Sequence, residues 1–156
     1  MEVTFAPRGI LQIDDARITH KNFAGEGSPY NREGDRNFSL IIGDEDLYNR
    51  LKDEGWNVKK KDPFDDADIP FMFLPVKVKF NERGPDVYLT SGRAKRKLSE
   101  DTIGILDNMD IETLNLDIRP YDWTLANGNS GRTAYLHSME VIQRISRFAS
   151  RYEDEE

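Results

Sequence analysis

Cations and aromatic rings occur close together at four places in this sequence, and that combination can bind phosphates and bases at once. Lys and Arg neutralise backbone phosphates and release their counterions, while flat rings hold unstacked bases, at roughly 1–3 kcal/mol for each stack. The chemistry suits a flexible nucleic-acid strand whose bases are accessible. The four groups, in chain order, are Tyr30, Arg32, Arg36 and Phe38; Trp56, Lys59, Lys60 and Lys61; Tyr88, Arg93, Lys95, Arg96 and Lys97; and Arg119, Tyr121, Trp123, Arg132 and Tyr135.

Two further cations, Lys77 and Lys79, point to the polar side of an alternating segment and extend this set. Each group also has a structural interpretation. Trp56 and Phe38 suit a core as well as a stacking platform, arginines can pair with the acids beside them, and lysines protect an edge strand from aggregation. Solvation alone explains the run from residue 93 to residue 97 least well, because four of its five residues are cations.

Residues that could catalyse a reaction are few and scattered. His20 and His137 show no metal-ligand spacing. Pro85-Asp86 resembles the beginning of a nuclease motif, but the acidic-x-Lys partner does not follow at a strand position. The sequence has no Gly-rich phosphate loop ending in Lys-Ser or Lys-Thr, no nucleophile elbow and no His-Glu-x-x-His. We therefore expect no enzyme, no metal and no cofactor.

Negative charge is concentrated at the C-terminus. The formal net charge is −7 although the sequence holds 22 Lys and Arg; the last four residues contribute −4, which leaves −3 on residues 1–152. Blocks of like charge are often flexible interaction tails. We therefore divide the chain into a binding domain at residues 1–146 and a charged tail at residues 147–156. The tail residues expected to contact protein partners are Glu153, Asp154, Glu155 and Glu156.

The composition indicates one intracellular domain. A chain of 156 residues suits a single core, and the absence of cysteine excludes disulfides, thiolate nucleophiles and sulfur-ligated zinc. Met1 precedes a mixed polar stretch without the features of a secretory leader, and no apolar run approaches a membrane span. We expect a cytoplasmic protein that does not contact membranes.

Alternation of apolar and polar residues predicts mainly antiparallel strands. The clearest case is residues 74–80, where every second residue is apolar and Lys77 and Lys79 point the other way. Roughly six strands follow, a common number for one sheet. The others lie at residues 10–23, as one long bent strand, and near residues 38–42, 87–89, 114–119 and 134–142.

Two short helices interrupt the strands. Asp44 is expected to cap the first, with Gly55 as its left-handed stop, and Ser99 to cap a second that Gly104 weakens. Residues 126–131 contain Asn-Gly and Ser-Gly and predict a hairpin tip. Together these elements predict an OB-fold-like antiparallel barrel of about five to six strands with two short helices. A β-sandwich with peripheral helices fits nearly as well.

Several blocks of the sequence resemble a family of small phage and prophage proteins that bind single-stranded DNA. They span roughly residues 10–143, and the longest reads Tyr30-Asn31-Arg32-Glu33-Gly34-Asp35-Arg36-Asn37-Phe38. The others lie at residues 22–25, 53–59, 87–91, 106–107, 117–123 and 128–136. The resemblance implies an OB-like barrel with a groove for single strands, acting in phage replication or recombination inside a bacterial host cell.

The residues and the resemblance together predict a protein that coats exposed single-stranded DNA with little sequence preference and without catalysis. The acidic tail is expected to compete weakly for the groove and to recruit replication or recombination proteins once DNA displaces it. A homodimer is a further expectation, since dimers are common.

Two other functions stay open at this point. The net charge favours an acidic protein-binding module of a mobile element, which would inhibit a host enzyme by presenting carboxylates in place of phosphates. The second of these alternatives is a metal-dependent nuclease that uses Asp65, Asp66 and Asp68.

Overall fold

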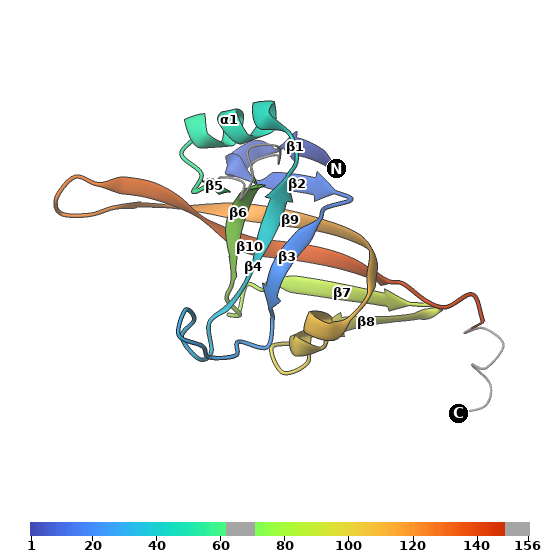
Figure 1. The fold of residues 1–156 in the computed structure, drawn as a ribbon. Coiled ribbons are helices and arrows are strands. Elements are labelled where there is room, and N and C mark those ends of the chain that lie inside the picture. The colour runs from blue at the N-terminus through green and yellow to red at the C-terminus, as the bar shows by residue number, and fades with distance from the viewer. Residues whose placement is uncertain (62–70, 149–156) are drawn as a thin grey trace.

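The computed structural model describes residues 1–61 and 71–148, which form a mainly β body with one α-helix and two short 3-10 helices (Figure 1). The strands are β1 Glu2–Phe5, β2 Leu11–Asp14, β3 Ile18–Asn22, β4 Arg36–Ile42, β5 Lys59–Lys61, β6 Phe71–Val78, β7 Asp86–Ser91, β8 Ala94–Leu98, β9 Ile111–Thr124 and β10 Ser130–Gln143. The helices are η1 Pro7–Gly9, α1 Glu45–Asp53 and η2 Ile103–Asn108. Within these residues, no helix is long and apolar enough to cross a lipid bilayer.

The described residues contain ten strands, so the prediction of about six was wrong. Two of the missed strands lack the apolar alternation of a half-buried strand: β5 is three lysines, and β8 buries only Leu98. The third, β1, alternates polar and apolar residues but is only four residues long. Residues 10–23 form two strands instead of one, because Asp15 takes a left-handed φ of 53°. The Asp15 amide donates to the side-chain oxygen of Asn115 at 2.9 Å, which holds this turn against β9.

Strand β10 organises the sheet, whose hydrogen-bonded order is β1-β2-β9-β10-β6-β4-β3. One edge of β10 pairs antiparallel with β9. The other edge is shared, with β6 beside its first half and β7 beside its second half, both parallel to it. The prediction of antiparallel pairing was therefore wrong for these two pairs. The path of paired strands among the described residues ends at β1 and β3 without closing. Strand β8 continues the sheet beyond β7.

Alternating residues of the long strands fill one apolar core. Phe38, Leu74, Ile118 and Leu136 are each at most 2% exposed. Burial of side chains of this size is worth roughly 1.5–3 kcal/mol each relative to exposure. Because the strand period is two, burial of this set turns the intervening residues of β4, β6, β9 and β10 to the opposite face.

The predicted helix α1 and hairpin are confirmed, and the second helix differs in detail. An Asp44 oxygen accepts from the Asp46 amide at 3.0 Å, and Gly55 has a φ of 91°. The second helix is a 3-10 turn that begins at Ile103, because Ser99 is tied to Thr102: its amide donates to the threonine hydroxyl at 2.8 Å. At the hairpin tip the amide and carbonyl of Leu125 bond across the turn. Figure 1 shows this tip extending well beyond the sheet.

Candidate nucleic-acid interface

One row of side chains crosses four strands on the outer face of the sheet. The register places Asn37 of β4 beside Lys77 of β6, Lys77 beside Tyr135 of β10, and Tyr135 beside Arg119 of β9. We call these four residues the outer row. Their sequence neighbours Phe38, Val76, Ala134 and Ile118 are buried, so alternation turns the row away from the core. The row brings together cations and an aromatic ring from three separate strands.

Aromatic rings continue the outer row along the β9–β10 hairpin. Tyr121 lies edge-on to Tyr135 with ring centroids 6.1 Å apart and an interplanar angle of 81°. Trp123 follows two residues later on the same face, and its indole N–H donates to the Thr133 hydroxyl at 3.1 Å. Tyr121 is 55% exposed and Trp123 36% exposed. We call Tyr121, Trp123 and Tyr135 the aromatic ladder, and it offers ring surface on which bases can stack.

A glycine makes room for the largest of these rings. Gly131 lies directly across from Trp123 in the register. A Cβ atom added to Gly131 would lie 2.5 Å from the Trp123 ring, closer than carbon atoms can pack. The absence of a side chain at Gly131 therefore lets the indole lie flat against the backbone of β10.

The cations of this face are free to receive an anion. Among the described residues, Lys77, Lys79, Arg83 and Arg119 make no ion pair with an acid. The Arg119 guanidinium lies 4.7 Å from the centre of the Tyr135 ring. The predicted site residues that do pair with acids are Arg36 with Glu100 at 3.2 Å, Lys60 with Glu45 at 3.7 Å, Lys97 with Asp86 at 2.8 Å and Arg132 with Asp122 at 2.7 Å. An unpaired cation binds a phosphate without first giving up a partner.

Trp56 belongs to the core and not to the binding face. It is 3% exposed, and the Arg132 guanidinium lies 5.2 Å from its ring. Arg132 also donates two hydrogen bonds to Asp122, at 2.7 and 3.2 Å, which lower the pKa of Asp122 and raise that of Arg132. The sequence interpretation of Trp56 as a stacking platform is corrected here, because packing beneath the hairpin leaves its ring no free face.

The first predicted group is divided between a loop fastened to the outer row, which carries Tyr30 and Arg32, and β4, which carries Arg36 and the buried Phe38. The Asn31 side chain donates to three backbone carbonyls of the loop at 2.9 to 3.2 Å and accepts from the Asn37 side chain at 2.9 Å. Tyr30 is 99% exposed at the tip of this loop, and Arg32 is exposed beside it. A groove of about 570 Å³ runs from Asn31 past Arg36 to the outer row. Tyr30 and Arg32 therefore lie on either side of Asn31, in the loop at one end of this groove.

The second and third groups lie away from the outer row. The lysines of β5 pair with Phe71–Phe73, at the opposite end of β6 from Lys77. Arg93, Lys95 and Arg96 are exposed on the β7–β8 hairpin, at the far end of β10 from the hairpin tip (Figure 1). On this hairpin, Lys97 is 5.9 Å from the Tyr88 ring, and its hydrogen bond to Asp86 raises its pKa.

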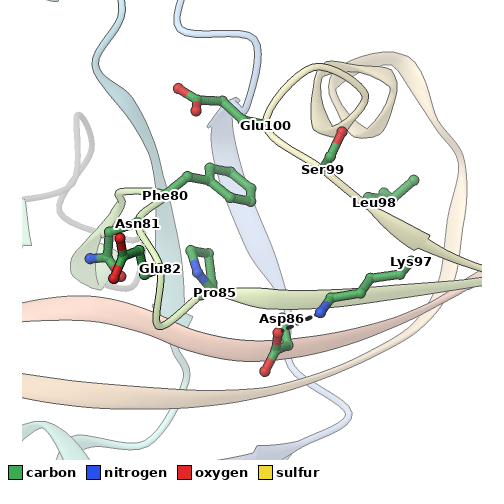
Figure 2. Close-up of a pocket in the computed structure, with 10 residues that line it drawn as sticks. Phe80, Asn81, Glu82, Pro85, Asp86, Lys97, Leu98, Ser99 and Glu100 are labelled. Carbon is green, nitrogen blue, oxygen red and sulfur yellow. Dashed lines mark ion pairs between the residues drawn. The ribbon is translucent and has the colours of Figure 1, made fainter.

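A groove between the β6–β7 turn and the end of β8 is acidic. Figure 2 shows the Phe80 ring and Pro85 on one side, with Lys97 bound to Asp86 across it. Its volume is about 460 Å³, and its lining also carries Glu82 and Glu100. Asp86 belongs to the sequence pair that resembles the beginning of a nuclease motif. In the structure its carboxylate forms an ion pair with Lys97.

Two other candidate sites, the acids of the predicted nuclease and the acidic tail, are not among the described residues. The described residues hold no group of three or more His, Asp or Glu that could bind a metal ion. The loop acids Asp65, Asp66 and Asp68 and the tail residues Glu153 to Glu156 lie outside the described residues. Sequence reasoning missed Asn37, which lies between Arg36 and Phe38 of the first group, and Arg83, which lies outside all four groups. Strand pairing with Lys77 is the signal that would have found Asn37.

Known proteins share this fold. At a TM-score of 0.58 and 14% identity, the chain is similar to the single-stranded DNA-binding protein from bacteriophage Enc34, with 94% of this chain and 88% of that chain covered. The structure of that phage protein in complex with ssDNA gives a TM-score of 0.57 and 15% identity over 94% and 93% of the two chains. Its C-terminal truncation gives 0.54 and 13% over 92% and 91%.

The family match covers almost the whole sequence. No curated protein matches the chain at a significant level. Residues 2–155 match the family described as "Putative phage ssDNA-binding domain". The chain therefore belongs to this family of phage ssDNA-binding domains.

Proposed function

We propose that this protein coats single-stranded DNA of a phage or prophage during replication or recombination, and that it holds the strand on the outer row and the aromatic ladder. The observation that carries the proposal is the coincidence of unpaired cations and exposed rings on one face of the β4–β6–β10–β9 sheet. Membership of the phage ssDNA-binding family supports the same conclusion and makes the acidic inhibitor the weaker alternative.

Binding of this kind requires no bond to be made or broken. Lys77 and Arg119 displace counterions from backbone phosphates, and bases stack on Tyr121, Trp123 and Tyr135. Charges and rings accept every base, because each base has a flat face and each nucleotide one phosphate. We therefore infer little sequence specificity and no catalytic role.

An OB-like barrel is the architecture that we propose for the binding domain at residues 1–146. Strand β2 lies next to β1 at one end of the hydrogen-bonded path and β3 forms the other end, yet only a short segment joins β2 to β3. Its Ala16 amide donates to Leu114 of β9 at 2.7 Å, and its Arg17 carbonyl accepts from Ile41 of β4 at 2.9 Å. This segment thereby links the two ends of the sheet through the chain itself, which supports a barrel with one strand-to-strand gap.

Two kinds of protein partner are proposed besides DNA. We propose that residues 147–156 form a charged tail that recruits replication or recombination proteins through Glu153 to Glu156, and that two copies associate. The charge of −4 at the end of the chain supports the first idea. We also propose that the protein acts in the cytoplasm of the bacterial host, which its membership of a phage ssDNA-binding family supports.

Fluorescence anisotropy tests the proposed function. Labelled oligo-thymidine and a matched duplex are titrated with the protein at low and at near-physiological salt. We expect tighter binding to the single strand than to the duplex, weakened by salt because counterions are released. Failure to bind the single strand at low salt would reject the proposal and leave the acidic protein-binding module as the better explanation of the charge.

A further inference from the structure

Three cations from three separate elements border one pocket beside the outer row. Lys79 follows the end of β6, Arg83 lies in the turn between β6 and β7, and Arg119 projects from β9. His137 of β10 completes the polar lining. The pocket has a volume of about 360 Å³, and no Asp or Glu of the described residues lines it. We call it the cationic pocket.

A tight turn fixes Arg83 at the rim of this pocket. The backbones of Asn81 and Gly84 bond to each other in both directions, at 2.8 and 3.1 Å. The Arg83 amide donates to the Asn81 side-chain oxygen at 2.8 Å. Gly84 has a φ of 115°, and a Cβ there would lie 3.1 Å from the Asp86 amide and 3.7 Å from the His137 carbonyl. The turn therefore packs closely against β10, which limits how far the Arg83 backbone can move.

His137 reaches the pocket because β10 bulges there. The register with β9 runs from Leu136 opposite Ile118 directly to Ser138 opposite Asp117, so His137 has no partner on β9. A bulge of this kind redirects the side chain of the extra residue. The His137 side chain is exposed and lines the pocket with the three cations.

Charge is sorted to the two sides of the β6–β7 turn. Asn81, Gly84 and Pro85 line both the cationic pocket and the acidic groove of Figure 2. The described lining of the groove has three acids, Glu82, Asp86 and Glu100, and one cation, Lys97, which is paired with Asp86. The charged residues in the described lining of the pocket are all cations. An anion is repelled from one side and attracted to the other, although the two are separated by a single turn.

We propose that the cationic pocket is a phosphate subsite, which holds one phosphate of a single strand while the adjacent base lies on the aromatic ladder. This inference rests on the proposed function. Arg119 connects the two parts, because it lines the pocket and its guanidinium also lies 4.7 Å from the centre of the Tyr135 ring. Planar guanidinium groups bind phosphate oxygens through two parallel N–H donors, and Lys79 adds a point charge. A phosphate in the pocket would therefore fix the register of the strand relative to Tyr135.

The test compares two double variants that remove the same charge. Lys79→Gln/Arg83→Gln empties the pocket of two cations and leaves Arg119 and the ladder intact. Arg17→Gln/Lys52→Gln is the matched control, which also removes one arginine and one lysine: Arg17 is exposed between β2 and β3, Lys52 is exposed on α1, and neither belongs to a predicted binding group. Affinity for oligo-thymidine is measured over a range of salt concentrations, and thermal unfolding confirms that each variant is folded.

We expect the pocket variant to bind about fivefold more weakly for each cation removed, and its salt slope to fall by about 0.7 for each phosphate that is no longer neutralised. The control should change neither quantity by as much. If the wild type binds and both variants show the same slope, the pocket is not a phosphate site although the coating function stands. If the wild type does not bind, the proposed function fails and the subsite fails with it.

Modified strands identify which phosphate occupies the pocket. Oligo-thymidine with a 5′-hydroxyl carries only internal phosphodiesters, and a 5′-phosphorylated strand adds a terminal phosphate. An equal decrease in affinity on both assigns the pocket to an internal phosphodiester, whereas a decrease confined to the phosphorylated strand assigns it to a chain end. A methylphosphonate strand carries no backbone charge, and the pocket variant and the wild type should therefore bind it with equal affinity. If the variant bound this neutral strand as much more weakly than the wild type as it binds the charged strand, the proposal would be contradicted, because Lys79 and Arg83 would then act without a charged phosphate.

Discussion

The β9–β10 hairpin and the β7–β8 hairpin lie at opposite ends of β10 (Figure 1). Both carry cations and aromatic side chains, in different proportions. The β7–β8 hairpin has the denser charge, with Arg93, Lys95, Arg96 and Lys97 within five residues. Its ring is Tyr88, beside which Lys97 is already bound to Asp86 at 2.8 Å. The cations of the β7–β8 hairpin therefore have few aromatic side chains beside them.

On the β9–β10 hairpin the rings outnumber the cations. Tyr121, Trp123 and Tyr135 share one face, and Arg119 lies over the last of them without an acidic partner among the described residues. The difference teaches that density of charge in a sequence does not identify the place where a strand is held. Stacking adds roughly 1–3 kcal/mol for each base, whereas an exposed charge pair contributes at most about 1 kcal/mol. We therefore expect the β9–β10 face to hold the strand and the β7–β8 hairpin to add general attraction.

Removal of the rings gives the largest expected effect. Tyr121→Ala and Trp123→Ala should each weaken binding of oligo-thymidine by about fivefold to 150-fold, since each substitution deletes one stack. Tyr88→Ala is the matched variant on the other hairpin, where the deleted tyrosine is 50% exposed, close to the 55% of Tyr121. Anisotropy titrations at one salt concentration measure all three. A decrease for Tyr88→Ala as large as that for Tyr121→Ala would show that the two hairpins hold bases alike.

Gly131→Ala gives a smaller effect and tests the position of one ring. The backbone of Gly131 is not left-handed, so only the indole, 2.5 Å from the new Cβ, opposes the substitution. The ring must move and break its hydrogen bond to Thr133, and affinity should fall by no more than it does on removal of Trp123 itself. Gly43→Ala is the control, because its added Cβ would have no heavy atom within 4 Å. The indole N–H signal of Trp123 in an NMR spectrum should shift only in Gly131→Ala, and unchanged affinity together with a shifted signal would remove the ring from the binding face.

Local pattern accounts for the parts of this fold that the sequence predicted well. Strands β6, β9 and β10 bury every second residue over long stretches, so alternation revealed them. The hairpin that joins β9 and β10 is also local, and its turn signal at residues 126–131 sets the register that brings Tyr121 and Tyr135 together. The fourth predicted group was therefore assembled correctly in space, apart from Arg132, which turns to Trp56 on the other face.

Pairing between segments far apart in the chain accounts for what the sequence could not reveal. The parallel pairing of β10 with β6 and β7 brings Lys77 beside Tyr135, and no turn or spacing encodes it. Trp56 follows a helix and precedes three lysines, a context that indicates exposure, but its bridge to Arg132 buries it. Arg83 is a lone cation in a polar turn, and only the packing of that turn against the bulge at His137 brings it to Lys79 and Arg119.

Removal of two cations, either from the outer row or from the β7–β8 hairpin, is expected to give the smallest effect and to sharpen the comparison most. Lys77→Gln/Arg119→Gln removes two unpaired cations of the outer row, and Lys95→Gln/Arg96→Gln removes two from β8. If the outer row binds phosphates directly, the first double variant should reduce the salt slope by about 1.4, which is about 0.7 for each phosphate. The second should slow association at low salt and change the slope less, because charges outside the contact surface mainly steer the encounter.

Salt titrations combined with stopped-flow association rates measure both quantities on the same variants. Each pair removes a charge of two, so the net charge of the protein changes equally and only its location differs. Equal slopes for the two pairs would mean that phosphates bind the β7–β8 hairpin as closely as they bind the outer row. The strand would then follow β10 along its whole length, and the site would extend from Trp123 to Lys95. A slope lowered only by the outer-row pair would confine the strand to the β4–β6–β10–β9 face, where unpaired cations and exposed rings coincide.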